Sequence, residues 1–250
     1  EDYPTFAHLP FVMGQDNAKL SKRNGEVSIA WYREQGFLPE AICNYLALLG
    51  WSPGDDREDI TMKELVELFE VHDVHSSPAR FDMKKLEAIN GDKIRALSPE
   101  DFLKWSLPFL TNAGIISGTD AELTLVKSAL PIIQERIVKL DEIPAMLKFL
   151  FVKEFAVEAD SKEKIKDDQS KQVLKRALEV LEPLASWNHE AIEGALRAAL
   201  IEEMGLKPRI AFGAVRIAAT GSHISPPLFE SMELLGKEAS ISRIKGAISL

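Results

Sequence analysis

The chain has 250 residues, of which 46% are hydrophobic and 28% are charged, and its formal net charge is −9. This composition is typical of a folded globular protein and excludes a disordered chain. No apolar stretch approaches the length of a membrane span, so we expect no membrane association, and the negative net charge excludes a surface that is basic all round.

Helical patterns run from residue 27 to residue 151. Thr61 and Glu64 form a capping box, and Asp82 caps a short helix that Asn90-Gly91 is expected to stop. One long helix over residues 121–140 is expected to bend at Pro131. The expected helices cover residues 27–35, 39–49, 61–69, 82–89, 98 towards 114, 121–140 and 145–151.

The remaining residues also read as helical, after a charged stretch over residues 158–175 that is expected to be an exposed connection and to become helical near residue 170. Gly205, Gly221 and Gly236 stand where helix C-caps belong. No alternating pattern long enough for a sheet follows the first twenty-odd residues, so the predicted fold is all-α, in successive small bundles. The expected helices here cover residues 173–181, 190–204, 210–220, 228–235 and 240–248.

Charge and cysteine content add two expectations. Residues 205–250 carry six basic and three acidic side chains, a net +3, whereas residues 1–204 carry −12. A locally basic end can still hold a polyanion, because salt confines the reach of each charge to about 8–10 Å.

The single cysteine, Cys43, lies in an apolar helical pattern, which predicts a buried thiol in a reducing, cytoplasmic compartment.

The stretch Lys19-Leu20-Ser21-Lys22-Arg23 is the most specific motif. Two ammonium groups with a hydroxyl between them can bind adjacent phosphate oxygens, although a solvated basic turn has the same composition. Other clusters of polar residues are weaker candidates for a functional site. The pair His72 and His75 lacks the further ligands that a metal site needs, so no metal site is expected, and no nucleophile elbow surrounds Ser222-His223.

The Lys19–Arg23 stretch resembles the KMSKS loop of class I aminoacyl-tRNA synthetases, in the KLSKR form typical of glutamyl-tRNA synthetase. The approach Pro4–Pro10 and three later blocks are similar to the same family in order and spacing. These blocks are Gly36–Ala41 with Asn44–Trp51, Phe81–Arg95 and Arg216–Glu238. The resemblance covers the chain nearly end to end. It implies a catalytic-domain tail with a short strand or loop over residues 1–25, a stem-contact helical domain over 26–97, and an α-helical anticodon-binding cage in two subdomains, 98–152 and 153–250.

The resemblance also implies roles for particular residues. Lys19, Ser21 and Lys22 would hold the phosphates of ATP during adenylate formation. Arg136 stands where discriminating members read the third anticodon base, although a surface arginine on a helix is an equal alternative. Arg216 would meet the anticodon loop, with Ser225, Pro226 and Leu228 around a splayed base, whereas Ser-Pro-Pro is also an ordinary helix start. Lys85 and Arg95 are weaker candidates for phosphate contacts along the stem. Pro227 departs from the glycine of many members.

The family further implies ATP with Mg²⁺, glutamate and glutamate tRNA as ligands of the full-length enzyme, and a monomer. Nothing here matches its His-Ile-Gly-His-type signature, so we expect a C-terminal half that binds no ATP and forms no adenylate by itself. Whether glutamine tRNA is also a partner stays open. Two alternatives compete, a stand-alone tRNA-binding module and a protein-interaction helical bundle. A glutaminyl enzyme is disfavoured, because its anticodon domains are β-barrels.

Overall fold

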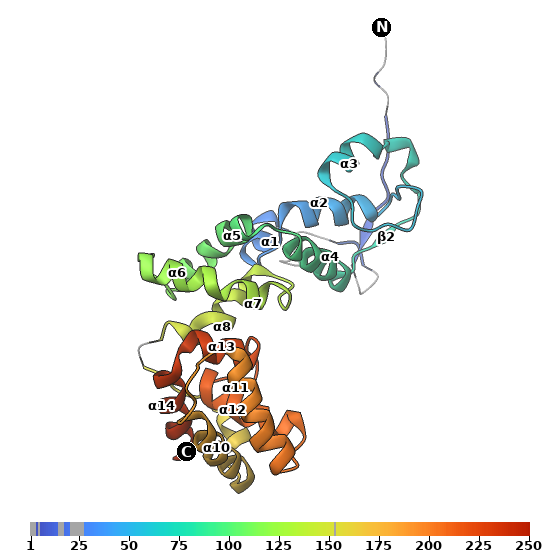
Figure 1. Ribbon diagram of the computed structural model, residues 1–250. Coiled ribbons are helices and arrows are strands. Elements are labelled where there is room, and N and C mark those ends of the chain that lie inside the picture. Colours follow the sequence, from blue (N-terminus) through green and yellow to red (C-terminus); the bar gives the residue numbers. More distant parts are fainter. Residues whose placement is uncertain (1–3, 5, 15–17, 21–27, 153) are drawn as a thin grey trace. The chain divides into compact units, whose positions relative to one another are not determined.

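The computed structural model of the chain describes residues 4, 6–14, 18–20, 28–152 and 154–250. These residues are mostly helical, which confirms the coarse prediction (Figure 1). They form two compact units, the first made of Glu1–Trp105 with Ile137–Glu142 and the second of Ser106–Arg136 with Ile143–Leu250. Within the described ranges, no helix combines the length and the hydrophobicity needed to cross a bilayer. The four domain ranges expected from the sequence stay a prediction.

In its described residues, the first unit contains the helices α1 to α4, the start of α5, the 3₁₀ turns η2 (Val71–Asp73) and η3, and a pair of two-residue strands. Strand β1 (Val12–Met13) pairs in parallel with β2 (Ala79–Arg80), a strand that the sequence pattern did not predict. The helices begin where capping side chains occur, since the Thr61 and Glu64 side chains form the predicted capping box and Asp82 accepts hydrogen bonds from the first turn of its helix. They are α1 (Ile29–Glu34), α2 (Pro39–Leu48), α3 (Met62–Leu68) and α4 (Met83–Arg95).

Helix α4 does not stop at Asn90-Gly91, which corrects the prediction. Asn90 is fully buried, and its amide side chain accepts a hydrogen bond from Leu38 N at 2.8 Å and donates to Gly36 O at 3.3 Å and Val138 O at 2.6 Å. An asparagine that satisfies three buried backbone groups is a packing residue of the helix interior, and its usual preference for helix ends is overridden.

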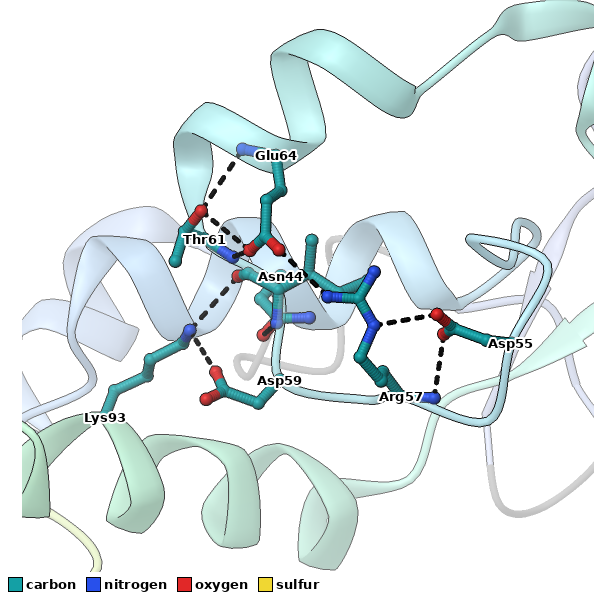
Figure 2. Close-up of polar contacts among 8 residues, drawn as sticks. Asn44, Asp55, Arg57, Asp59, Thr61, Glu64 and Lys93 are labelled. Carbon is teal, nitrogen blue, oxygen red and sulfur yellow. Dashed lines mark hydrogen bonds and ion pairs between the residues drawn. The ribbon is translucent and has the colours of Figure 1, made fainter.

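A polar network holds residues 55–64 to the helices around them (Figure 2). Asn44, also fully buried, donates to Glu58 O at 2.9 Å and accepts from Ile60 N at 3.0 Å. The Lys93 ammonium on α4 donates a hydrogen bond to Asp59 Oδ1 and a second one, at 3.1 Å, to Ile60 O. At the other end, Arg57 bridges Asp55 and Glu64. The network therefore gives this irregular segment the backbone partners that a regular element would supply.

The long helix expected over residues 121–140 is also wrong. Helix α6 (Asp120–Ala129) is followed by α7 (Pro131–Gln134), and residues 135–139 are not helical. In the first unit, Glu142 of the short turn η3 (Leu140–Glu142) accepts hydrogen bonds from Val138 N and Lys139 N, while Leu140 N donates to Gly36 O at 3.1 Å. These two local bonds and one tertiary bond replace helical ones.

The second unit is an all-helical bundle in which α10 packs against α11, α12 and α14 (Figure 1). Its core includes the buried side chains of Leu174, Ile192, Val215, Met232 and Ile244, one from each of the five helices α10 to α14. The predicted caps at Gly221 and Gly236 are confirmed, since both end helices with φ of 84°. The main helices are α10 (Asp168–Leu181), α11 (His189–Leu196), α12 (Pro208–Thr220), α13 (Leu228–Leu235) and α14 (Lys237–Ile248).

Shorter helices complete the second unit. They are α6 and α7, α8 (Ile143–Leu147), η4 (Lys148–Leu150), α9 (Ala159–Lys162), η5 (Glu163–Ile165) and η6 (Arg197–Glu203), together with the end of α5 (Pro99–Asn112). Two predictions need correction here. The expected helix over 145–151 is α8 followed by a 3₁₀ turn. The 158–175 stretch buries Ser161 and Ile165, so it is not simply an exposed connection. The predicted helical segment over 190–204 is confirmed, with α11 in its first half and the π-helix η6 in its second.

The thiol of Cys43 is exposed, contrary to expectation. Helix α2 turns Ala41, Asn44 and Tyr45 into the core, and residue 43 falls outside that buried stripe. An apolar stretch that covers more than one helix face does not by itself locate the buried side. The expectation of a core thiol was therefore wrong.

An ion pair between α11 and α13 predicts a pH dependence of stability. Glu233 Oε2 lies 2.9 Å from His189 N and 2.7 Å from His189 Nδ1. The hydrogen bond raises the pKa of His189 and lowers that of Glu233. The pair's contribution is therefore complete below the ordinary histidine pKa of about 6.5 and above the ordinary glutamate pKa of about 4.3. It fades as pH rises through the raised His189 pKa or falls through the lowered Glu233 pKa.

We expect a Glu233→Gln variant to melt below the unmodified chain near pH 5.5, with a gap that narrows towards pH 9. Scanning calorimetry at several pH values measures this gap. The matched control is Glu202→Gln, which removes an exposed carboxylate of η6 (Arg197–Glu203) that is not among the charges raising the pKa of His189. A gap of constant size across the pH range would contradict the charged pair.

Candidate functional site

The predicted phosphate-binding motif is only partly described. Lys19 is exposed, forms an isolated antiparallel bridge with Met13, and places its ammonium 3.9 Å from the centre of the Phe11 ring. Ser21 and Lys22 lie outside the described residues. The Lys19 ammonium is thus accessible to an anion, while the role of the three-residue set stays a prediction.

Arg216 is held by Ser225 and Pro226, which were predicted to belong to the same site. It lies on α12, and its Nη1 donates to Pro226 O at 2.7 Å and to Ser225 Oγ at 2.9 Å. A guanidinium has five N–H donors in a fixed plane. In the described part of the chain, the side-chain hydrogen bonds of Arg216 all come from Nη1, which leaves donors on Nε and Nη2 for a ligand.

Arg136 lies close enough to Arg216 for their charges to interact. Burial, and secondly the positive charge of Arg136, lower the pKa of Arg216. Arg136 itself is exposed, directly after the turn that ends α7. Two guanidinium groups that repel each other gain most from a shared anion, because it neutralises both. The charge of Arg136 thus acts on Arg216 although the two residues lie 80 positions apart in the sequence, and their shared role stays a prediction.

The remaining residues predicted around the splayed base are buried. Ser225 is 8% exposed, Leu228 is 3% exposed and belongs to the core of the second unit, and Pro226 is also buried. The Ser225 hydroxyl accepts from Arg216. The three residues surround and support the arginine in this structure, and their direct contact with a base stays a prediction.

A second anchor of this segment comes from residues that the sequence analysis dismissed or did not name. His223 N donates to Ser161 Oγ at 3.1 Å, and His223 Nδ1 lies 3.0 Å from the same hydroxyl and 3.4 Å from Asp160 Oδ2. Ser161 is fully buried on α9. Ser222-His223 is thus no nucleophile and base. Ser161 and Arg216 fix the two ends of residues 223–226, and the buried serine carries no motif that could have revealed this role.

A groove of about 650 Å³ runs along α12 beside these residues. Lys164, Arg209, Arg216 and His223 line it together with apolar side chains of α12. Most of the lining charge is positive, so the groove suits an anionic ligand.

The weaker phosphate candidates in the first unit are engaged with carboxylates. Lys85 Nζ lies 2.7 Å from Glu58 Oε1, and Arg95 Nη2 lies 2.6 Å from Asp92 Oδ1. A polyanion would have to displace or share these partners. His72 lies 3.4 Å from Asp73 Oδ1, and the described residues contain no group of three or more side chains placed to hold a metal ion.

Two family models match this chain. A model described as "Anticodon binding domain" matches residues 101–248, and one described as "tRNA synthetases class I (E and Q), catalytic domain" matches residues 2–88. The first covers more than half of the chain. The chain therefore belongs to the anticodon-binding-domain family of tRNA synthetases.

Curated glutamate–tRNA ligases match this chain over nearly its whole length. The chain is 47% identical over 248 residues to glutamate–tRNA ligase of Saccharopolyspora erythraea, with 98% of the chain and 49% of the relative covered. It is 50% identical over 250 residues to the same enzyme of a Nocardioides species, with 98% and 51% covered. The resemblance drawn from the sequence motifs is thus confirmed, and the chain spans about half the length of these relatives.

Solved structures agree. A glutamate tRNA ligase from Elizabethkingia meningosepticum, in complex with its amino acid, superposes with a TM-score of 0.77 at 28% identity, covering 99% of this chain and 52% of that one. The glutamate-tRNA synthetase of Elizabethkingia anophelis superposes with a TM-score of 0.76 at 27% identity, covering 100% and 52%.

Proposed function

We propose that this chain is the tRNA-binding half of a glutamate–tRNA ligase, which attaches glutamate to its tRNA through an ATP-dependent glutamyl-adenylate. The observation that carries the proposal is Arg216, which Ser225 and Pro226 hold through Nη1, within the residues matched by the anticodon-binding model. A planar guanidinium can make paired hydrogen bonds to the edge of an unstacked base, which is how single-stranded RNA is read.

The finer roles belong to the same proposal. Arg136 reads the third anticodon base, and Arg216 meets the anticodon loop from α12. Residues 26–97 contact the tRNA stem, and residues 98–250 form the anticodon cage in two subdomains. Lys19, with Ser21 and Lys22, holds the phosphates of ATP, to which Mg²⁺ binds. These last roles rest on the family resemblance and on the exposure of the Lys19 ammonium.

A stand-alone tRNA-binding module and a protein-interaction bundle remain the competing functions. The match of residues 2–88 to a catalytic-domain model favours the ligase over both, since neither alternative needs residues of a catalytic domain.

Binding of the 250-residue chain to glutamate tRNA tests the proposal. We expect saturable binding whose affinity falls steeply as salt rises, because each phosphate contact releases counterions. Fluorescence anisotropy with labelled tRNA at 50 to 200 mM salt measures the slope of log affinity against log salt. Absence of binding, or binding that ignores salt, would contradict an RNA interface on this chain and favour the protein-interaction bundle.

A further inference from the structure

Another cavity of the second unit is bordered by residues 155–157, α9 and α14, and has a volume of about 410 Å³, within the size range of small-molecule sites. It shares no lining residue with the groove along α12. Arg243 and Lys162 line it, and no carboxylate of the described chain does. Most of the remaining wall is apolar and comes from Phe155, Ala156, Val157, Ala247 and Leu250.

Arg243 carries a half-buried charge that has only neutral partners. Its Nη1 donates to Ala219 O and its Nη2 to Phe149 O, each at 2.9 Å, and its Cζ lies 4.0 Å from the centre of the Phe155 ring. Burial lowers the pKa of Arg243 to about 10, so the guanidinium stays charged at neutral pH. The two carbonyls use two of its five donors but do not balance its charge, and charges removed from water are normally paired.

The acidic residues that follow this segment have partners elsewhere. Glu158 pairs with Lys148, and Asp160 Oδ2 lies 3.4 Å from His223 Nδ1. Neither Glu158 nor Asp160 lines the cavity. An anion from outside the chain is therefore the partner that the cavity lacks.

The wall that faces α14 is held in place. Glu158 N donates to Gly221 O at 2.9 Å, so the segment is bound to the end of α12. A Cβ built on Gly221 would lie 3.0 Å from Ala156 O and 3.1 Å from Phe155 Cε2, which shows how closely the two segments pack. A cavity with a fixed wall binds a ligand at little cost in conformational entropy.

We propose that this cavity binds a small monocarboxylate with an aliphatic tail. Its carboxylate accepts hydrogen bonds from the free N–H groups of Arg243, whose planar fork matches two oxygens, and from the Lys162 ammonium. The tail lies against the apolar wall of Val157 and Ala247. The proposal does not rest on the proposed function, because it involves no tRNA contact.

Titration of the 250-residue chain with hexanoate, followed by ligand-observed proton NMR, tests the proposal. We expect saturable binding of hexanoate and about tenfold weaker binding of 1-hexanol, which has the same tail without the charge. Lys162→Gln should weaken hexanoate binding about threefold. The matched control Lys127→Gln removes an exposed lysine of α6 that does not line the cavity and should leave the affinity unchanged.

Two further variants test the cavity itself. Arg243→Gln should weaken hexanoate binding about tenfold, with circular dichroism to check its fold, because it also loses bonds to Ala219 and Phe149. Gly246→Leu adds a side chain to the cavity lining and should reduce binding by a similar factor. Its control is Gly194→Leu on α11, outside the lining; an added Cβ meets no described atom within 4 Å at either glycine.

Three results would overturn the monocarboxylate site. They are absence of hexanoate binding, equal affinity for hexanoate and 1-hexanol, and equal hexanoate affinity of the Gly246→Leu and Gly194→Leu variants. None of them requires Arg243→Gln to fold, and none bears on the binding of glutamate tRNA.

Discussion

Replacing Asn90 by leucine is expected to lower the free energy of unfolding of the first unit by about 3 kcal/mol or more. The amide of Asn90 satisfies Leu38 N, Gly36 O and Val138 O from a fully buried position. Leucine has a similar volume but no polar atoms, so three buried backbone groups lose a partner, and each such loss costs about 1–3 kcal/mol. Water cannot easily replace the amide where no space exists for it.

The packing at this junction makes the loss hard to relieve. Gly36 adopts a φ of 81°, and a Cβ added there would lie 2.4 Å from Leu140 N. The two segments thus touch backbone to backbone, and a shift that rescued one bond would break another. Urea unfolding followed by tryptophan fluorescence measures the change, with Asn112→Leu as the control because Asn112 is exposed at the end of α5. A loss of less than about 1 kcal/mol in the free energy of unfolding would contradict the claim that these backbone groups lose their hydrogen-bond partner.

Replacing Arg216 by alanine is expected to weaken binding of glutamate tRNA by about 1–3 kcal/mol, roughly 5- to 150-fold, under the proposed function. The substitution removes the donors that face the groove and also the anchor of Ser225 and Pro226. Arg216→Lys should recover little, because an ammonium cannot reproduce a planar fork of donors.

Two further variants separate reading from anchoring in that experiment. Ser225→Ala removes one of the anchoring bonds of Arg216 and leaves its charge, so it should weaken binding less than Arg216→Ala. Arg176→Ala removes an arginine that already pairs with Glu179 and Glu203, and it should bind like the unmodified chain. Equal affinity of the Arg216→Ala and Arg176→Ala variants would move the anticodon contact away from Arg216.

Much of the fold follows from local signals in the sequence. The starts of α3 and α4 were correctly placed because Thr61, Glu64 and Asp82 act within one turn of their own helices. The stop at Asn90-Gly91 was wrong for the opposite reason. Asn90 bonds residues 48 to 54 positions away, and no local pattern reports such partners. Tertiary bonds of the same kind end the helical run before Val138.

The same difference between local signals and tertiary partners decides which parts of the candidate site could be predicted. The motifs around Arg136 and Arg216 could be found from the sequence, but the hold of Ser225 and Pro226 on Arg216 depends on how the second unit folds. Ser161 could not be found, because a buried serine that accepts the His223 backbone N–H looks like any other serine in the sequence. The groove along α12 is lined by Lys164, Arg209 and Arg216, and only the packed structure brings them to one groove.

Binding of the chain to glutamate tRNA, compared with the same tRNA carrying a different third anticodon base, tests the central claim most directly. The proposed function predicts tight binding that the base change weakens roughly 5- to 150-fold, since a lost paired contact to a base costs about 1–3 kcal/mol. An Arg136→Ala variant should lose this difference while it still binds both RNAs. Equal affinity of the unmodified chain for the two tRNAs would contradict reading of the third base by Arg136.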